Sequence, residues 1–412
     1  MLDIKFIREN KAVVEANNAS RNVKIDLDLL LSLDEERSAL QQKIDQLRAE
    51  RNRRSKTKPT EEEIALMRKL GDEIGGLEDL AAEKSEMMNR LLLQLPNINH
   101  ESTPVGKDEN SNKIERKVGE QPVFNFQPKE HFEIPAVAEL IDTERGARMS
   151  GSRFYFYRGK LAILERALIQ YVVDSIVARG YELMLPPLLV KDEAMFGTGF
   201  FPADKNEVYS VNPDDDDLYL IGTSEVPLVS FHRDEVLDVA GLPKKYVSVT
   251  PCFRREAGSY GKDTKGVFRV HQFYKVEMVI FASPTDSWNL HDELLGIEES
   301  VLQSLGLSYQ VVNICSGDLG FPAAKKYDCE GWFPGQGTYR ELTSTSNTTD
   351  YQARRSNIKF KNAEGKREFV HTLNGTGISD RALLALLENY QTEDGGVVVP
   401  EVLRKYTGFD RL

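Results

Sequence analysis

The sequence predicts an α+β protein of two or three domains, in which a helical hairpin precedes a larger domain that contains β-hairpins. Two observations predict it. Apolar residues between 33 and 95 recur at alternating spacings of four and three on both sides of Pro59 and Thr60, which is typical of two packed helices. Between 251 and 281, two strand-like runs flank a basic, glycine-rich loop, which is typical of a β-hairpin.

Composition narrows the class of protein. Hydrophobic residues make up 40% and charged residues 29% of the chain, as in soluble globular proteins. The net charge of −12 argues against a surface that coats nucleic acid, so any RNA contact must come from a local basic patch. The cysteines and histidines show no metal-ligand spacing, which disfavours zinc and disulfides. No apolar run reaches membrane-spanning length and the first residues lack targeting character, so we expect a cytoplasmic protein.

The first third of the chain is predicted to be helical. Short helices up to Leu33 precede a long helix with Leu40, Ile44 and Leu47 on one side, and Pro59 and Thr60 end it. Thr60 and Glu63 form a capping-box pattern that opens the second helix. The apolar positions of that helix follow the four-three spacing: Leu70, Ile74, Leu77, Ala81, Met88, Leu91 and Leu95. Two such stripes predict an antiparallel pair.

A basic cluster lies near the expected tip of this hairpin, with Glu50 as its one acid. Its members are Arg48, Arg51, Arg53, Arg54, Lys56 and Lys58. A run of charge is usually a solvated helix face, and the alternative is a surface for an RNA backbone. The cluster alone leaves both interpretations open.

The middle of the chain is predicted to hold a linker and then helices. Residues 96–126 are rich in Pro, Asn and Ser and lack periodicity, which indicates a linker. Helices are expected over 136–144 and 161–179, and a short strand should follow from Gly180 to Pro187. The apolar strand at 218–228 contains Thr223 and Glu225 two residues apart, so both can share one face and bind a hydroxylated ammonium compound. Capping of a following helix by Thr223 or Ser224 is the alternative.

The hairpin at 251–281 contains the largest group of candidate ligand-binding residues. Phe273, Lys275 and Glu277 are predicted on one face of its second strand, which we expect to line a cavity, while the other face joins the core. The basic loop suits a polyphosphate, and an aromatic ring near paired Arg and Glu suits a purine. An ordinary hairpin with a solvated basic loop is the alternative.

Two later segments add candidate binding groups. Gly335 to Ser344 reads as a turn that feeds a strand, on which strict alternation would put Glu341 and Ser344 on opposite faces. A bulge or the end of the strand must intervene if both bind one ligand. Asn374 to Arg381 reads as a strand, a glycine-rich turn and the start of an apolar helix, which is a plausible phosphate site.

These segments resemble a known family. Phe253-Arg254-x-Glu256, a loop and Arg269-x-x-x-Phe273 resemble motif 2 of class II aminoacyl-tRNA synthetases, and RREAGS with HQFYKVE is similar to the seryl-tRNA synthetase version. Residues 180–187 resemble motif 1, residues 374–381 resemble motif 3, and Thr223-x-Glu225 resembles the family's serine-pocket signature. AERNRRSK and GVVVPEVL are also similar to family segments.

The resemblance implies a domain order and an activity. It implies an N-terminal tRNA-binding domain over 1–100 with a coiled-coil arm at about 33–95, a linker at 101–130, and a class II catalytic domain with an antiparallel sheet at 131–412. Such enzymes activate L-serine with ATP as seryl-adenylate and transfer it to tRNA(Ser), and family members also serylate selenocysteine tRNA. The arm holds the long variable arm of the tRNA, and the motif 1 region forms a homodimer.

The resemblance also implies roles for single residues, with Arg254 and Arg381 as the catalytic pair. The implied ATP-binding residues are Arg254, Glu256, Arg269, Phe273, Glu341, Ser344 and Arg381. Glu341 and Ser344 would hold Mg²⁺. The implied serine-binding residues are Thr223, Glu225, Arg254, Glu277 and Thr376. The implied tRNA-binding residues are the six of the basic cluster.

Two departures from the family pattern concern the pocket. Gly222 and Ser224 replace the more usual Pro and Ala, and Arg381 follows Gly375 by six residues where seven are usual. We therefore expect the turn at 378–380 to tighten, with Asp380 at the helix start. Two alternatives to the housekeeping enzyme remain: a paralogue with a modified pocket that serves antibiotic resistance or another non-translational role, and a non-catalytic RNA-binding paralogue.

Overall fold

The computed structural model describes residues 1–54, 60–213, 215, 217–258, 261 and 263–412. The chain divides into two compact units, residues 1–98 and 99–412, and each is described by itself.

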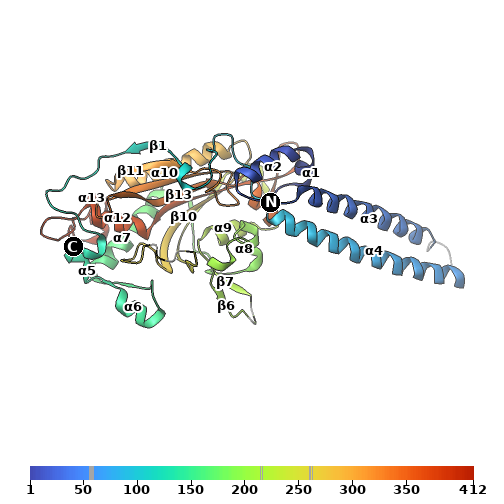
Figure 1. Cartoon of the computed structure of the whole chain (residues 1–412), viewed down its shortest axis with the longest axis horizontal. Helices are drawn as coiled ribbons and strands as arrows, with labels where there is room; N and C mark the ends of the chain where they lie inside the picture. Colours follow the sequence, from blue (N-terminus) through green and yellow to red (C-terminus); the bar gives the residue numbers. More distant parts are fainter. Residues whose placement is uncertain (55–59, 214, 216, 259–260, 262) are drawn as a thin grey trace. The chain divides into compact units, whose positions relative to one another are not determined.

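The first unit is helical (Figure 1). It contains α1 (Ile4–Glu9), α2 (Lys11–Ser20), α3 (Leu27–Arg54) and α4 (Glu61–Leu93). α3 begins six residues before the predicted start because Leu27 and Leu30 are buried in the small core at its base. That core also holds Leu92, near the C-terminal end of α4, and Leu95, two residues beyond it.

The predicted antiparallel pairing of α3 and α4 is confirmed. Ile44 of α3 and Ile74 of α4 are buried, and three ion pairs cross between the two helices. These are Lys43 with Glu73 at 3.1 Å, Arg48 with Glu78 at 2.7 Å, and Lys84 with Glu36 at 2.7 Å. The capping box is also present, because Thr60 accepts a hydrogen bond from Glu63 N–H while the Glu63 carboxylate accepts one from Thr60 N–H.

The second unit is built on an eight-stranded sheet in the order β1-β11-β12-β13-β16-β10-β9-β4. Every neighbouring pair is antiparallel except β4 and β9. The strands are β1 (Lys113–Val118), β4 (Glu182–Met184), β9 (Lys244–Phe253), β10 (Gln272–Ala282), β11 (Tyr309–Asn313), β12 (Lys325–Phe333), β13 (Thr338–Asn347) and β16 (His371–Ser379). The α+β prediction is therefore confirmed.

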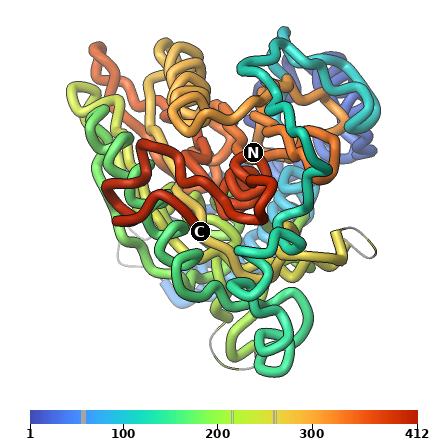
Figure 2. The backbone as a smooth tube through the Cα atoms, turned by 90° about the vertical axis from the view of Figure 1, so that its left-hand side faces the viewer, coloured from blue at the N-terminus to red at the C-terminus, as the bar shows by residue number. Residues whose placement is uncertain are grey.

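One large core joins this sheet to its helices. Leu164 of α7 (Gly159–Val177), Leu294 of α10 (Ser287–Ser304) and Leu383 of α12 (Asp380–Asn389) belong to it, together with Val276 and Met278 of β10. The C-terminal segment, red in Figure 2, lies beside the residues that precede α7, and Ala136 N–H donates to Gly395 O at 3.0 Å. Among the described residues, no helix is long and apolar enough to cross a membrane.

The remaining elements are short. The helices are α5 (Pro135–Ala138), α6 (Thr143–Ser150), α8 (Asp192–Thr198), α9 (Glu225–Ser230), α11 (Tyr351–Ser356), α13 (Glu401–Thr407), and the 3-10 turns η1 (Glu109–Ser111), η2 (His131–Glu133), η3 (Lys205–Glu207) and η4 (Val239–Gly241). The strands are β2 (Ile141–Asp142), β3 (Phe156–Tyr157), β5 (Leu189–Lys191), β6 (Ser210–Val211), β7 (Leu218–Leu220), β8 (Val236–Asp238), β14 (Lys359–Lys361) and β15 (Arg367–Phe369).

Two expectations for the middle of the chain need correction. The predicted linker contains β1, which pairs with β11 at the edge of the main sheet. β1 lacks an apolar stripe because its residues are almost all exposed. The single helix expected over 136–144 is instead α5 and α6 with β2 between them, and Asp142 caps α6 by accepting from Arg145 N–H at 2.9 Å.

A β-bulge in β13 allows Glu341 and Ser344 to line the same cleft, although strict alternation would put them on opposite faces. Cys329 lies opposite Thr343 and Glu330 lies opposite Glu341, so Leu342 is an extra residue on β13. The extra residue shifts the alternation by one, and Glu341 and Ser344 both line the same cleft. Of the two expected alternatives, the bulge is present, and the strand does not end near Ser344 but continues to Asn347.

A second bulge corrects the prediction for 374–381. The glycine-rich segment is not a turn, because β16 continues to Ser379 and α12 begins directly at Asp380. Gly377 is the extra residue between the pairs Glu277–Thr376 and Val276–Ile378. A Cβ atom on Gly377 would lie 2.7 Å from Cδ1 of Ile176, so close packing against α7 favours a glycine here. The expected position of Asp380 at the helix start is confirmed.

Candidate active site

The predicted hairpin of β9 and β10 forms and positions Arg254 just beyond β9. Cys252 pairs with Phe273 across the hairpin, and Arg254 N–H donates to His271 O at 3.0 Å. The Arg254 side chain then turns inward, where its Nε donates to Gly222 O at 3.3 Å and its guanidinium lies 5.2 Å from the centre of the Phe273 ring. A backbone bond and a ring contact therefore orient this cation.

We define the first cleft by the residues that line it from β10, β13, α12 and the hairpin loop. It contains every residue predicted to bind ATP: Arg254, Glu256, Arg269, Phe273, Glu341, Ser344 and Arg381. Arg269 donates from Nη1 to Oε2 of Glu256 at 2.6 Å, which fixes both side chains on one wall. Glu256 has a positive φ of 52°, a conformation uncommon for residues other than glycine.

Glu341 and Arg381 face each other at the mouth of the first cleft. Arg381 Nη1 donates to Glu341 Oε2 at 3.0 Å, and its guanidinium lies 4.8 Å from the centre of the Phe268 ring. Partial desolvation opposes ionisation of Glu341, whose side chain is 46% exposed, but the positive charges of Arg381, Lys326 and Arg254 prevail and lower its pKa to about 2. Glu341 is therefore a carboxylate at neutral pH.

We define the second cleft by a separate set of lining residues that adjoins the first. It contains every residue predicted to bind serine: Thr223, Glu225, Arg254, Glu277 and Thr376. Thr376 Oγ1 donates to Glu277 Oε2 at 3.3 Å, and Lys275 Nζ lies 2.5 Å from the same oxygen. Glu277 and Lys275 are both buried.

The prediction that Thr223 and Glu225 share a strand face is wrong, although both side chains reach the second cleft. β7 ends at Leu220, and Glu225 is the first residue of α9. Thr223 Oγ1 accepts a hydrogen bond from Glu225 N–H at 3.2 Å, so the alternative of a hydroxyl at the helix start is also present. Gln352 of α11 donates to the Glu225 carboxylate at 2.7 Å.

Electrostatics in the second cleft favour a cationic ligand. Burial raises the pKa of Glu225, and the negative charge of Glu277 raises it further. A ligand ammonium group between the two carboxylates would offset this repulsion and stabilise both charged forms.

The two clefts meet at four shared residues: Arg254, Lys275, Ser344 and Thr376. A ligand that occupies both clefts must therefore pass the Arg254 guanidinium. Planar guanidinium groups bind carboxylates and phosphates through paired hydrogen bonds. The junction suits a reaction between a carboxylate from one cleft and a phosphate from the other.

Sequence patterns assigned no binding role to several charged groups of the two clefts. Lys275 was predicted on the cavity-lining face of β10, and it does line both clefts. Lys326 lines the second cleft and lies 3.0 Å from Asp328, but no motif marks this part of β12. Asp204 also lines the second cleft.

Two acids interact where no pattern predicted them: Asp380, buried at the start of α12, and Glu165, partly buried on α7. Asp380 accepts hydrogen bonds from Tyr155 Oη at 2.9 Å and from Tyr274 N–H at 3.0 Å. Burial and the negative charge of Asp380 raise the pKa of Glu165 of α7 to about 9. The pair ties α7 to the helix that carries Arg381.

The basic cluster lies at the end of α3. Arg53 is exposed, Arg48 pairs with Glu78, and Arg54 pairs with Glu50 one helical turn away at 2.7 Å. Exposed pairs of this kind contribute little stability, so these guanidinium groups can exchange their partners for phosphates. Lys56 and Lys58 lie outside the described residues.

Two family models match separate parts of the chain. Residues 1–99 match the seryl-tRNA synthetase N-terminal domain, and residues 209–390 match the tRNA synthetase class II core domain (G, H, P, S and T). A serine–tRNA ligase from Thermodesulfovibrio yellowstonii is 47% identical over 100% of this chain and 99% of its own length. One from Nitratidesulfovibrio vulgaris is 48% identical over 99% and 98%.

Solved structures are also similar over the whole chain. The seryl-tRNA synthetase of Pyrococcus horikoshii, complexed with ATP, superposes with a TM-score of 0.91 at 42% identity and covers 100% of this chain and 99% of its own. The cytoplasmic serine–tRNA ligase of Naegleria fowleri, in complex with AMP, gives 0.88 at 37% identity and covers 100% and 98%.

Proposed function

The chain belongs to the seryl-tRNA synthetase family, ATP-dependent ligases that join serine to tRNA, and we propose that its two adjoining clefts divide the first step between them. The first cleft holds ATP and the second holds serine. The observation that carries this assignment is the position of Arg254 on the wall of both clefts.

The chemistry at the junction is an in-line displacement. The serine carboxylate attacks the α-phosphorus of ATP, which forms seryl-adenylate and releases pyrophosphate. A terminal ribose hydroxyl of tRNA then attacks the carbonyl carbon of the adenylate. Because the nucleophile is already a carboxylate, the protein contributes positioning and charge neutralisation, and Arg254 supplies both by holding the serine carboxylate beside the α-phosphate.

The walls of the first cleft suit the other parts of ATP. The Phe273 ring stacks on adenine, and Glu256 accepts a hydrogen bond from the adenine amino group while Arg269 orients that carboxylate from 2.6 Å. Arg381 binds the γ-phosphate, and this contact replaces its hydrogen bond to Glu341. The contact between Arg381 and Phe268 keeps the guanidinium over the cleft during that replacement.

Glu341 and Ser344 fit a Mg²⁺ ion bound together with the nucleotide. Both are oxygen ligands, the bulge at Leu342 brings them to one cleft, and Glu341 remains a carboxylate because its pKa is about 2. When bound, the ion offsets the negative charge of the phosphates.

In the second cleft, Glu225 and Glu277 bind the serine ammonium group. Thr223 and Thr376 lie on the same walls and bind the serine hydroxyl, so an amino acid without a hydroxyl would leave these polar groups unpaired. Lys275 Nζ lies 2.5 Å from Oε2 of Glu277 and orients that carboxylate.

We further propose that the arm binds the long variable arm of tRNA(Ser) and that the motif 1 region forms a homodimer in the cytoplasm. Arg53 and its basic neighbours on α3 support the first proposal. The second rests on β4, which is one of the two edge strands of the main sheet, and on Leu185 beside it, which is 80% exposed.

The experiment that tests the function is ATP–pyrophosphate exchange with a panel of small amino acids, followed by charging of tRNA(Ser). We expect exchange to be fastest with serine and charging to follow. Exchange with a different amino acid, or serine exchange without charging, would favour the paralogue with a modified pocket. Absence of exchange would favour the non-catalytic RNA-binding paralogue.

A further inference from the structure

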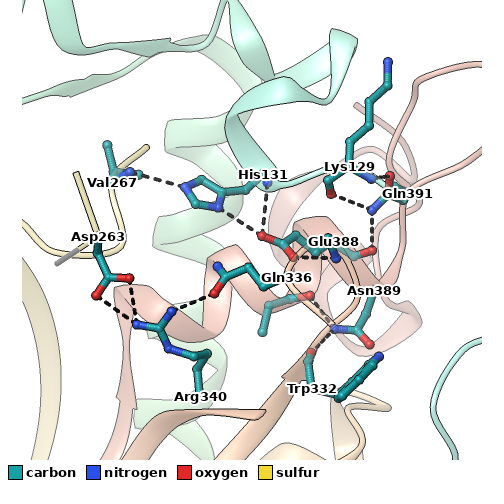
Figure 3. Close-up of polar contacts among 12 residues, drawn as sticks. Lys129, His131, Asp263, Val267, Trp332, Gln336, Arg340, Glu388, Asn389 and Gln391 are labelled. Carbon is teal, nitrogen blue, oxygen red and sulfur yellow. Dashed lines mark hydrogen bonds and ion pairs between the residues drawn. The ribbon is translucent and has the colours of Figure 1, made fainter. Parts of the chain in front are cut away.

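A buried histidine and a buried glutamate contact each other beside Val267, a residue that lines the first cleft (Figure 3). His131 begins η2, and Glu388 lies in α12, the helix that carries Arg381. Their side chains are 1% and 0% exposed, and His131 Nδ1 lies 3.1 Å from Glu388 Oε1. Neither residue lines either cleft.

The Glu388 carboxylate accepts hydrogen bonds from three donors, two on His131 and one on Gly335. Oε1 accepts from the backbone N–H of His131 at 3.1 Å and from the His131 ring, while Oε2 accepts from Gly335 N–H at 3.1 Å. Gly335 opens the turn that leads into β13. These hydrogen bonds satisfy the buried carboxyl group and fix the positions of the groups that donate to it.

The two partners of the ring determine its tautomer. Val267 N–H donates to His131 Nε2 at 3.2 Å, so Nε2 is unprotonated and the ring proton resides on Nδ1, where it is donated to Glu388. The hairpin loop also packs directly on the ring. Gly266 has a φ of 65°, and a Cβ atom there would lie 2.4 Å from His131 Nε2.

Val267 starts the segment that forms one wall of the first cleft. The next residue, Phe268, lies between two guanidinium groups, with Arg340 3.9 Å and Arg381 4.8 Å from its ring centre. Arg269 then holds Glu256. The position of the Val267 backbone therefore determines the positions of Phe268 and Arg269 on this wall of the first cleft.

We propose that His131 is a positioning residue for ATP: its unprotonated Nε2, held in that tautomer by Glu388, fixes the backbone at Val267 and thereby sets Phe268, Arg269 and Arg381 in the first cleft. The proposal rests on the proposed function, since it assigns ATP to that cleft. The proposed role depends on the acceptor nitrogen of the His131 ring. A role in packing alone would depend only on the size and shape of the ring.

Two variants of the full chain, each with a side-chain amide in place of the His131 ring, test the acceptor at Nε2 separately from the donor at Nδ1. The Asn amide nitrogen takes the place of Nδ1, so His131→Asn keeps the bond to Glu388 and removes the acceptor for Val267. The Gln carbonyl reaches the place of Nε2, so His131→Gln keeps the acceptor. His232→Asn is the matched control, because His232 is also buried and bonds to Glu235 at 2.7 Å and to Tyr246 at 2.8 Å, and it lines neither cleft.

We expect His131→Asn to raise the Kd for ATP about fivefold to tenfold, the loss typical of one hydrogen bond, and to leave the KM for serine unchanged. His131→Gln and His232→Asn should bind ATP nearly as the unmodified chain does. Equal Kd values for His131→Asn and His131→Gln, or weaker ATP binding by His131→Gln, would overturn the proposal.

Nitrogen NMR of the unmodified chain, labelled with ¹⁵N-histidine, provides a test that does not depend on the folding of variants. The proposal requires a neutral His131 ring with its proton on Nδ1 at pH 7, and a proton on Nε2 would overturn it. Calorimetry measures ATP binding without serine and tests the role of His131. Serine-dependent exchange tests the proposed function. One of these proposals can therefore fail while the other holds.

Discussion

Glu277→Gln tests whether the second cleft is the serine site. The substitution keeps the shape of the side chain and removes its negative charge. Glu277 is 2% exposed and holds Lys275 at 2.5 Å, so the change would leave a buried ammonium group facing a neutral amide and would remove one partner of the serine ammonium group. A hydrogen bond to a charged group is worth roughly 1.5 to 3 kcal/mol, which corresponds to an increase of about 10-fold to 150-fold in the KM for serine.

The binding of ATP should change much less, by under about threefold, because Glu277 lines the second cleft and not the first. Exchange kinetics at varied serine give the KM, and calorimetry gives the Kd for ATP. Glu298→Gln is the control, since burial raises the pKa of Glu298 well above its usual range and the amide then changes little charge. Equal losses for serine and ATP in Glu277→Gln would refute the assignment of the two clefts.

Three further predictions concern the arm, the nucleotide and the stability of the core. Replacing Arg51, Arg53 and Arg54 by Ala should weaken tRNA binding and lower its salt dependence by about one slope unit per lost phosphate contact, and unchanged affinity in filter binding would contradict this. Phe273→Ala should weaken ATP binding by about 5-fold to 150-fold while Phe273→Tyr retains it, as measured by calorimetry, and equal binding by both would exclude the stack. The pKa of Glu165 is raised to about 9, so its stabilising effect is complete at low pH and is lost as the pH rises toward 9, and Glu165→Gln should flatten that loss in urea titrations.

Local patterns predicted the parts of the site that lie close together in sequence. The hairpin of β9 and β10 followed from alternation around a glycine-rich loop, and its polar face does line a cavity. The residue types at 254–273 were specific enough to resemble a family motif, and the bulge in β13 followed from requiring Glu341 and Ser344 to share a ligand.

Contacts between distant segments were beyond these patterns. Gly377 was taken as part of a turn, but its role depends on Ile176 of α7, which packs where a Cβ atom would lie. Gln352 reaches Glu225 from a different helix. β1 was assigned to a linker because an exposed edge strand needs no apolar stripe.

A crystal structure of the protein with a non-hydrolysable analogue of seryl-adenylate tests the central claim most directly. The account predicts adenine between Phe273 and Glu256 in the first cleft, the serine ammonium group between Glu225 and Glu277 in the second, and the phosphate mimic against Arg254. An analogue that leaves the second cleft empty, or that places its adenine there, would contradict it.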